Sequence, residues 1–193
     1  MSITEATDQI IQERRSIYTN MFSGKQVDDA VIEKMIANAR WAPTHKLTEP
    51  WQFVIFKGDG LQKLSEFQAE LYRKKAEREN TYTEEKYLKF KNKPLECSHV
   101  IAIGMKRNEV VPEVEEICAV ACAVQNMWLT ASAHRVGCYW STGGVTFYDE
   151  AKPFFGLGEN DRLLGFLYIG NVKSDKWPNG RRKSMEEKAK WIV

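Results

Sequence analysis

Residues 112–137, PEVEEICAVACAVQNMWLTASAHRVG, decide the fold because they describe one long helix without a continuous polar face. Pro112 and the glutamates after it suit the N-terminal end of a helix, whereas Arg135 and Gly137 suit its C-terminal end. A protein of this size can cover a helix that is apolar nearly all round only with difficulty. We therefore predict a long buried central helix that a second copy of the chain helps to cover, in a homodimer.

The rest of the composition indicates one domain, residues 1–193, that stays in the cytoplasm. The uncharged run from Ile117 to Ala133 is shorter than the roughly 20 residues that a bilayer requires, and polar residues interrupt it. The N-terminus lacks the order of a signal peptide, and the four cysteines form no close CxxC pair, which predicts a reducing compartment. A net charge of only +2 gives no field for nucleic acid or an anionic membrane.

Shorter elements surround the long helix. Runs of β-branched and aromatic residues predict strands at 51–56, 99–104 and 162–170, the first of them buried, and a short strand at 137–140. Apolar periodicity predicts a helix after the capping box of Ser2 and Glu5, and another that starts at Asp28 and stops before Pro43. Residues 43–50 are then a loop, residues 61–93 hold two exposed helices, and residues 171–193 form an extended arm with a short last helix.

Basic residues near both ends of the chain are the first candidates for a binding site. Arg14 and Arg15 could grip a phosphate, because a guanidinium forks onto two oxygens and stays charged, or could simply favour the C-terminal end of a helix. Arg181, Arg182 and Lys183 form a second basic cluster, for which a solvated tail is the simplest interpretation. These alternatives stay open from the residues alone.

The cysteines and histidines give weaker signals. Cys118 and Cys122 are four positions apart and face the same way on a helix, but core packing is favoured over metal binding because no further ligand lies at zinc-site spacing. We predict no metal site. His99 stands at the start of a strand, which favours a structural role, and the residues around His45 do not by themselves indicate catalysis.

Other familiar catalytic motifs are missing from the sequence. Ser141, Asp149 and Glu150 could be imagined as a hydrolase triad, but there is no GxSxG turn. There is also no GxGxxG after a strand and no GxxxxGK[ST], so a Rossmann or P-loop site has no support. The pair Gly143 and Gly144 is either a place where the backbone approaches a ligand closely or a plain turn.

Taken in order, these pieces resemble the nitroreductase family of flavin mononucleotide (FMN) oxidoreductases. The resemblance is carried by Arg14-Arg15-Ser16, by Ala42-Pro43-Thr44-His45 with Glu49-Pro50-Trp51, by the long helix, by residues 137–144, and by Arg182-Lys183. It covers almost the whole chain except the charged segment 61–93, and the His45-Lys46 pair is similar to the loop of a branch of small members. The resemblance implies an α+β fold with a central, mainly antiparallel sheet wrapped by helices, and an obligate homodimer with two FMN sites at its interface.

The resemblance also assigns roles to residues. It implies that Arg14 and Arg182 hold the FMN phosphate, with Arg15 and Ser16 near the ribityl chain or ring edge. Pro43, Thr44, His45 and Leu47 would come from the other subunit to the ring, and the backbone of Trp140, Ser141, Thr142 and Gly143 would pass along its pyrimidine or N5 side. Leu47, Glu49 and Tyr18 stand where many members carry Asn, Gln and a basic residue.

The implied activity is reduction of nitroaromatics, quinones or related conjugated acceptors, with NADH or NADPH as reductant, in a ping-pong cycle. The chemistry belongs to the flavin, so no catalytic residue of the protein is predicted. Two alternatives remain: a specialised relative on the same fold that performs reductive dehalogenation or flavin breakdown, and a flavin-binding module without turnover.

Overall fold

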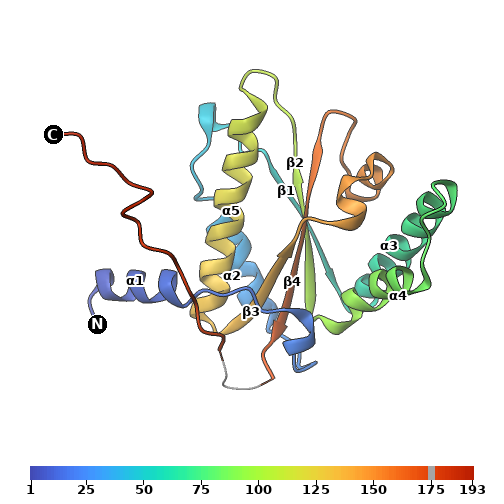
Figure 1. The fold of residues 1–193 in the computed structure, drawn as a ribbon, viewed down its shortest axis with the longest axis horizontal. Helices are drawn as coiled ribbons and strands as arrows, with labels where there is room; N and C mark the ends of the chain where they lie inside the picture. The colour runs from blue at the N-terminus through green and yellow to red at the C-terminus, as the bar shows by residue number, and fades with distance from the viewer. Residues whose placement is uncertain (174–176) are drawn as a thin grey trace.

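A computed structural model describes residues 1–173 and 177–193 (Figure 1). Its sheet has four antiparallel strands in the order β1-β2-β4-β3: β1 (Trp51–Lys57), β2 (His99–Met105), β4 (Arg162–Asn171) and β3 (Val136–Ser141). All four predicted strands are therefore confirmed, and so is the α+β class with an antiparallel sheet. Gly165 has φ of 123°, and a Cβ there would come within 2.3 Å of the Ser141 carbonyl oxygen, so only glycine lets β4 and the end of β3 approach so closely.

Helices cover both faces of this sheet. On one face lie α2 (Asp29–Ala39) and α5 (Glu113–Ala133), and on the other lie α3 (Asp59–Arg78) and α4 (Glu84–Asn92) (Figure 1). A hydrophobic core lies on each face of the sheet, and alternate residues of β2 point into one or the other. Ile101 and Ile103 pack toward α5, whereas Val100 and Ala102 pack on the other side. Because β2 is buried on both faces, its sequence is a nearly continuous apolar run.

The first strand differs from the prediction. We expected the segment at Trp51 to be buried, but β1 lies at the edge of the sheet and Ile55 is 43 % exposed. Aromatic and β-branched composition indicates a strand but does not tell a central strand from an edge strand, so the burial was predicted wrongly.

The long helix is confirmed, with Pro112 at its N-cap and residues 113–133 in the helix. Its inner side is buried through residues such as Val120, Val124 and Met127, while Val114, Ile117, Cys118 and Cys122 are exposed in the single chain. The core position predicted for Cys118 and Cys122 is therefore wrong. Helix α5 is therefore apolar on its outer side as well as on its inner side, and one chain leaves the outer side uncovered.

Both ends of the chain project from the body (Figure 1). Helix α1 (Ile3–Glu13) has the predicted capping box of Ser2 and Glu5, but none of its residues is buried and Ile3 is 88 % exposed. In the tail, residues 177–193 are extended apart from a turn at Met185, so the predicted last helix does not form. Unlike α1, which contacts α5, residues 181–193 are all exposed and lack the packing that would hold a short helix. Residues 174–176 of the predicted arm lie outside the described residues.

Short 3-10 turns complete the fold. They cover Thr19–Met21, His45–Leu47, Lys93–Glu96, Gly144–Phe147 and Asp149–Phe155. Among the described residues, no helix combines the length and apolarity needed to cross a bilayer.

Candidate functional site

The end of α1 brings Arg14, Arg15 and Ser16 against the sheet. Ser16 forms a parallel bridge with Cys138 of β3, and the Ile17 amide donates to the Cys138 carbonyl at 2.9 Å. Because the bridge is parallel, Arg14 and Arg15 lie beside the start of β3, whereas the segment after Ser16 runs on to Tyr18, whose ring centroid is 4.7 Å from that of Tyr139. Residues 14–16 and β3 therefore lie side by side within one chain.

Arg14 is held beside aromatic surface and close to a second cation. Its guanidinium lies 4.6 Å from the centroid of the Trp128 ring. Burial lowers the pKa of Arg14 from its ordinary value, and the positive charges of Arg182 and Arg15 lower it further. Among the described residues neither Arg14 nor Arg182 forms an ion pair with a carboxylate. Two guanidinium groups without a carboxylate partner, drawn from the two ends of the chain, are chemically suited to an anion.

The Arg15 guanidinium differs from that of Arg14, because it donates hydrogen bonds to backbone carbonyls. Its Nε donates to the Pro178 carbonyl at 3.0 Å, and its Nη1 donates to the Arg14 carbonyl at 2.8 Å. The tail packs so closely that a Cβ on Gly180 would lie 2.4 Å from the Arg15 Cζ. Trp177 adds an indole hydrogen bond to the Glu13 carbonyl at 2.6 Å. Arg15 therefore docks the tail beside Arg14.

The end of β3 is open to a ligand. Trp140 is fixed by a hydrogen bond from its Nε1 to the Leu164 carbonyl at 3.0 Å, while Thr142 and Gly143 are exposed. A Cβ added at Gly143 would meet nothing within 4 Å. The backbone there can be approached from outside.

The loop before β1 is shaped by unusual backbone angles. Lys46, Leu47 and Glu49 all have positive φ values, of 52°, 54° and 43°. Such conformations cost non-glycine residues of order 1–3 kcal/mol each and persist where the surroundings impose them. The Thr44 hydroxyl accepts from the Glu49 amide at 3.1 Å, and Leu47 points into solvent.

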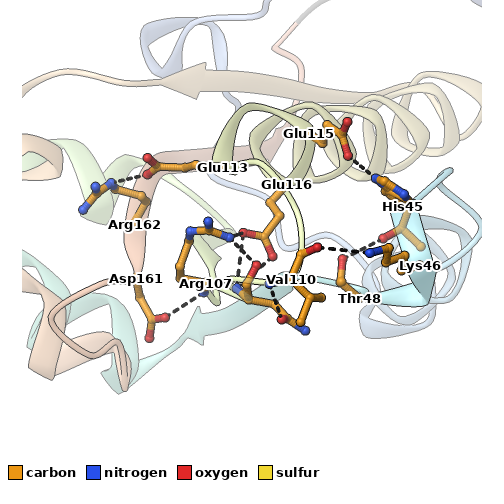
Figure 2. Close-up of polar contacts among 12 residues, drawn as sticks. His45, Lys46, Thr48, Arg107, Val110, Glu113, Glu115, Glu116, Asp161 and Arg162 are labelled. Carbon is orange, nitrogen blue, oxygen red and sulfur yellow. Dashed lines mark hydrogen bonds and ion pairs between the residues drawn. The ribbon is translucent and has the colours of Figure 1, made fainter.

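Helix α5 supports this loop (Figure 2). The Nδ1 atom of His45 pairs with the Glu115 carboxylate, and the Lys46 ammonium donates to the Val110 carbonyl at 3.3 Å. Beside the pair is a groove of about 380 Å³, lined by Pro43, Thr44 and His45 and by one side of α5 from Val114 to Cys122.

A buried ion pair fixes the start of α5 beneath the loop (Figure 2). Arg107 Nη1 donates to Glu116 Oε2 at 2.6 Å, and the Asn108 amide donates to Glu116 Oε1 at 3.0 Å. Glu116 is only 1 % exposed. On the outer side, Asp161 accepts from the Arg107 amide at 2.9 Å. These bonds hold the segment between β2 and α5, and therefore Glu115, in one position.

The two halves of the predicted site do not meet within one chain. His45 contacts Glu115 near the start of α5, whereas Arg14 lies over Trp128, 13 positions further along. At 1.5 Å per residue, these contacts are about 20 Å apart along the helix. Residues 43–47 are therefore far from Arg14 within one chain.

A further pocket holds residues that the sequence did not single out. It has a volume of about 390 Å³ between α3, α4 and the end of β3, and Lys93, Gln68, Ser141 and Gly143 are among its lining residues. Lys93 also lines a groove of about 550 Å³ that runs toward Tyr18. Together the two spaces extend from the segment after Ser16 to Gly143.

Lys93 is the half-buried cation of this pocket, which the exposed Lys86 and Lys89 also line. Its ammonium lies 4.3 Å from the Tyr168 ring centroid and 4.6 Å from that of Tyr139, and among the described residues it has no carboxylate partner. Burial lowers its pKa to about 8, with a smaller contribution from the charge of Lys89. In the sequence Lys93 is one of several lysines on a charged segment, so no local signal separates it from a solvated face.

The remaining candidates have structural environments. His99 is 2 % exposed, with its Nε2 3.0 Å from Asp29 Oδ1 and its Nδ1 2.9 Å from the Ser98 hydroxyl, which agrees with the structural role predicted for it. Within the described ranges, no group of three or more His, Cys, Asp or Glu residues is arranged to hold a metal ion.

Comparison with known proteins gives the class of this fold and site. The model of the nitroreductase family matches residues 11–171, and the chain belongs to that family. It is 29 % identical over 164 residues to "Putative NAD(P)H nitroreductase YfhC" of Bacillus subtilis, covering 83 % of this chain and 81 % of the relative. It is 31 % identical over 142 residues to "Putative NAD(P)H nitroreductase YdjA" of Escherichia coli K12, covering 72 % and 74 %.

A solved structure shows the same fold over the full length. The nitroreductase-like family protein from Bacillus cereus superimposes with a TM-score of 0.79 at 28 % identity, covering 100 % of this chain and 98 % of the other. The charged segment 61–93, which the sequence motifs did not match, is therefore included in the shared fold.

Proposed function

We propose that this protein is an FMN-dependent oxidoreductase that uses NADH or NADPH to reduce nitroaromatics, quinones or related conjugated acceptors. The observation that carries the proposal is the pair of guanidinium groups, Arg14 and Arg182, which come together from the two ends of the chain without a carboxylate partner among the described residues. Solved structures of the same fold support it: one from Desulfovibrio desulfuricans is a complex with FMN, and the FMN-dependent nitroreductase NfnB from Mycobacterium smegmatis is a complex with NADPH.

The residues present fit FMN. Arg14 and Arg182 suit a phosphate, and the exposed backbone at Gly143 allows close approach of a flat ring. Between them lies Lys93, a partly desolvated cation with aromatic neighbours. A ligand that matches the two arginines, Lys93 and the Gly143 backbone in turn has a phosphate at one end and a planar, electron-accepting ring at the other.

We propose a homodimer as the active form. Residues 43–47 lie about 20 Å along α5 from Arg14, so they can reach the same ligand only if they come from a second chain. The exposed apolar residues of α5 and the uncovered faces of α1 supply the surface that such a dimer would bury. In this arrangement the His45 loop of one subunit closes the FMN site of the other.

Bound FMN would supply the redox chemistry, by accepting a hydride from the nicotinamide and passing the electrons to the acceptor. The contribution of the chain is to hold the phosphate with Arg14 and Arg182 and to place a positive charge near the ring. Because backbone carbonyls engage the Arg15 guanidinium, Lys93 is better placed than Arg15 to stabilise negative charge on the reduced ring. No side chain of the protein is required as a general acid.

The test is an absorption spectrum of the purified protein with FMN, before and after anaerobic addition of NADH or NADPH. We expect a bound-flavin spectrum that bleaches on reduction and recovers when a nitroaromatic or quinone is added. A protein that takes up no FMN would overturn the proposal. Bound flavin that neither nicotinamide reduces would instead identify a flavin-binding module without turnover.

Replacing Arg182 with alanine is expected to weaken FMN binding about 10-fold, because one charge-assisted hydrogen bond to the phosphate is lost from an exposed position. Fluorescence titration of FMN measures the change. Arg181→Ala is the matched control, since Arg181 is also exposed and is adjacent in the chain. Equal losses in the two variants would indicate a general effect of tail charge rather than a specific contact.

The affinity for FMN is expected to depend on pH through Lys93. Its pKa is about 8 without ligand, and a ligand oxygen that accepts from the ammonium favours the protonated form. Binding should therefore be strongest below pH 8 and fall about 10-fold between pH 7 and 9. The stability of the unligated protein should change in the opposite direction. Lys93 keeps its proton to higher pH in the unfolded chain than in the folded one, so the free energy of unfolding should rise between pH 8 and the ordinary pKa of lysine.

Titrations of Lys93→Met at the same pH values test this assignment. The variant should bind FMN more weakly at pH 7 and lose most of the pH dependence. Lys63→Met, at an exposed position on α3, should behave like the unmodified protein. An unchanged pH profile in Lys93→Met would show that another group is responsible.

A further inference from the structure

One buried polar atom remains without a partner in the described part of the chain. Gln68, on the inner side of α3, is 1 % exposed, and its side-chain Oε1 accepts no hydrogen bond from residues 1–173 or 177–193. Buried amide oxygens are almost always bonded, because leaving one unpaired costs its full desolvation. The orphan oxygen therefore indicates a missing donor.

The position of Gln68 limits what that donor can be. It lines the pocket of about 390 Å³ that also contains Lys93, Ser141 and Gly143, with Tyr72 and Phe90 among the surrounding aromatic side chains. A ligand that fits these groups is flat, presents an N–H to the amide oxygen and presents an acceptor to the ammonium. The Gln68 side chain also lies within hydrogen-bonding reach of the Tyr168 hydroxyl, and an amide whose Nε2 donates to that hydroxyl keeps its Oε1 for the ligand.

The pyrimidine edge of an oxidised flavin has this pattern, since its single ring N–H, at N3, lies between two carbonyl groups. We propose that Gln68 is a positioning residue that accepts the N3–H of bound FMN, while Lys93 faces a neighbouring carbonyl oxygen. This inference rests on the function proposed above and adds to it the group that recognises the imide. A residue on α3 would thereby determine which flavins the site accepts.

The test compares two probes, FMN and its N3-methyl derivative, in fluorescence titrations of the full-length protein. N3-methylation removes the donor and places a methyl group against the amide oxygen, so the unmodified protein should bind the derivative at least about 10-fold more weakly. In Gln68→Ala, FMN binding should fall about 10-fold, and the preference for FMN over the derivative should largely disappear. Gln62→Ala, which changes an exposed glutamine on the same helix, should keep the preference.

The outcomes separate this inference from the proposed function. If the unmodified protein binds both flavins equally well, Gln68 does not contact N3 and its partner is only an ordered water. Discrimination that persists in Gln68→Ala would also overturn the inference, because another group would then recognise N3. If FMN itself does not bind, the proposed function fails together with the inference. Should Gln68→Ala not fold, Gln68→Met, which keeps the length of the side chain but removes the amide oxygen, takes its place in the same comparison.

Discussion

Replacing Arg14 with methionine is expected to lower the affinity for FMN about 100-fold while leaving the thermal unfolding temperature of the unligated protein nearly unchanged. Charge-assisted hydrogen bonds contribute about 1.5–3 kcal/mol, and Arg14 is more buried than Arg182, so its loss should fall near the upper end. Stability is maintained because the loss of the Trp128 contact is offset by removing a partly desolvated charge that faces Arg182. Fluorescence titration and thermal unfolding measure the two quantities.

The control for Arg14→Met is Arg73→Met, which removes an exposed guanidinium that pairs with Glu70 on α3. It should change neither FMN binding nor stability by more than the small amount typical of surface ion pairs. If Arg14→Met bound FMN normally, the phosphate would have to be held elsewhere, and the proposal for the site would be wrong. A large loss of stability would instead show that Arg14 serves mainly to pack on Trp128.

Removing the Glu116 carboxylate should have the largest effect on stability. The carboxylate is buried and accepts from both Arg107 and the Asn108 amide, so Glu116→Ala leaves a mostly buried guanidinium and a backbone N–H unpaired. Breaking a buried pair on one side costs about 3–5 kcal/mol. Urea unfolding should show this loss as a lower midpoint.

Two further variants separate the buried pair from general effects of charge. Glu113→Ala removes the carboxylate of a more exposed pair with Arg162 and should cost less than about 1 kcal/mol. The double variant Arg107→Met with Glu116→Leu should recover much of the stability, because no charge is then left buried alone. If Glu116→Ala unfolded at the same urea concentration as the unmodified protein, the pair would not hold the start of α5.

Local sequence signals predicted most of the elements. The capping box at Ser2, the N-cap at Asp28 and the proline at Pro112 mark helix starts that the structure reproduces. These signals act within a few residues, so they can be seen without knowing the fold. The prediction of a short last helix was wrong, because that segment has nothing to pack against in the single chain.

Features that depend on distant partners could not be predicted in the same way. Whether Trp51–Lys57 is a central or an edge strand depends on the strand order, and the exposure of Cys118 depends on which side of α5 the sheet covers. Lys93 and Gln68 acquire significance only because α3, α4 and the end of β3 enclose a common pocket. The family resemblance indicated Arg14, Arg15 and Arg182 as site residues, but it did not predict that the tail packs on Arg15.

The docking of the tail on Arg15 has a consequence for how the protein matures. The carbonyl of Pro178 and the close approach of Gly180 bring Arg182 toward Arg14, so the proposed clamp joins segments more than 160 positions apart in the chain. The last strand ends at Asn171, so the sheet contains no residue of the tail, whereas the clamp requires it. The clamp would then be the last part of the site to form during maturation, and a chain shortened before Trp177 would keep its sheet but bind FMN more weakly.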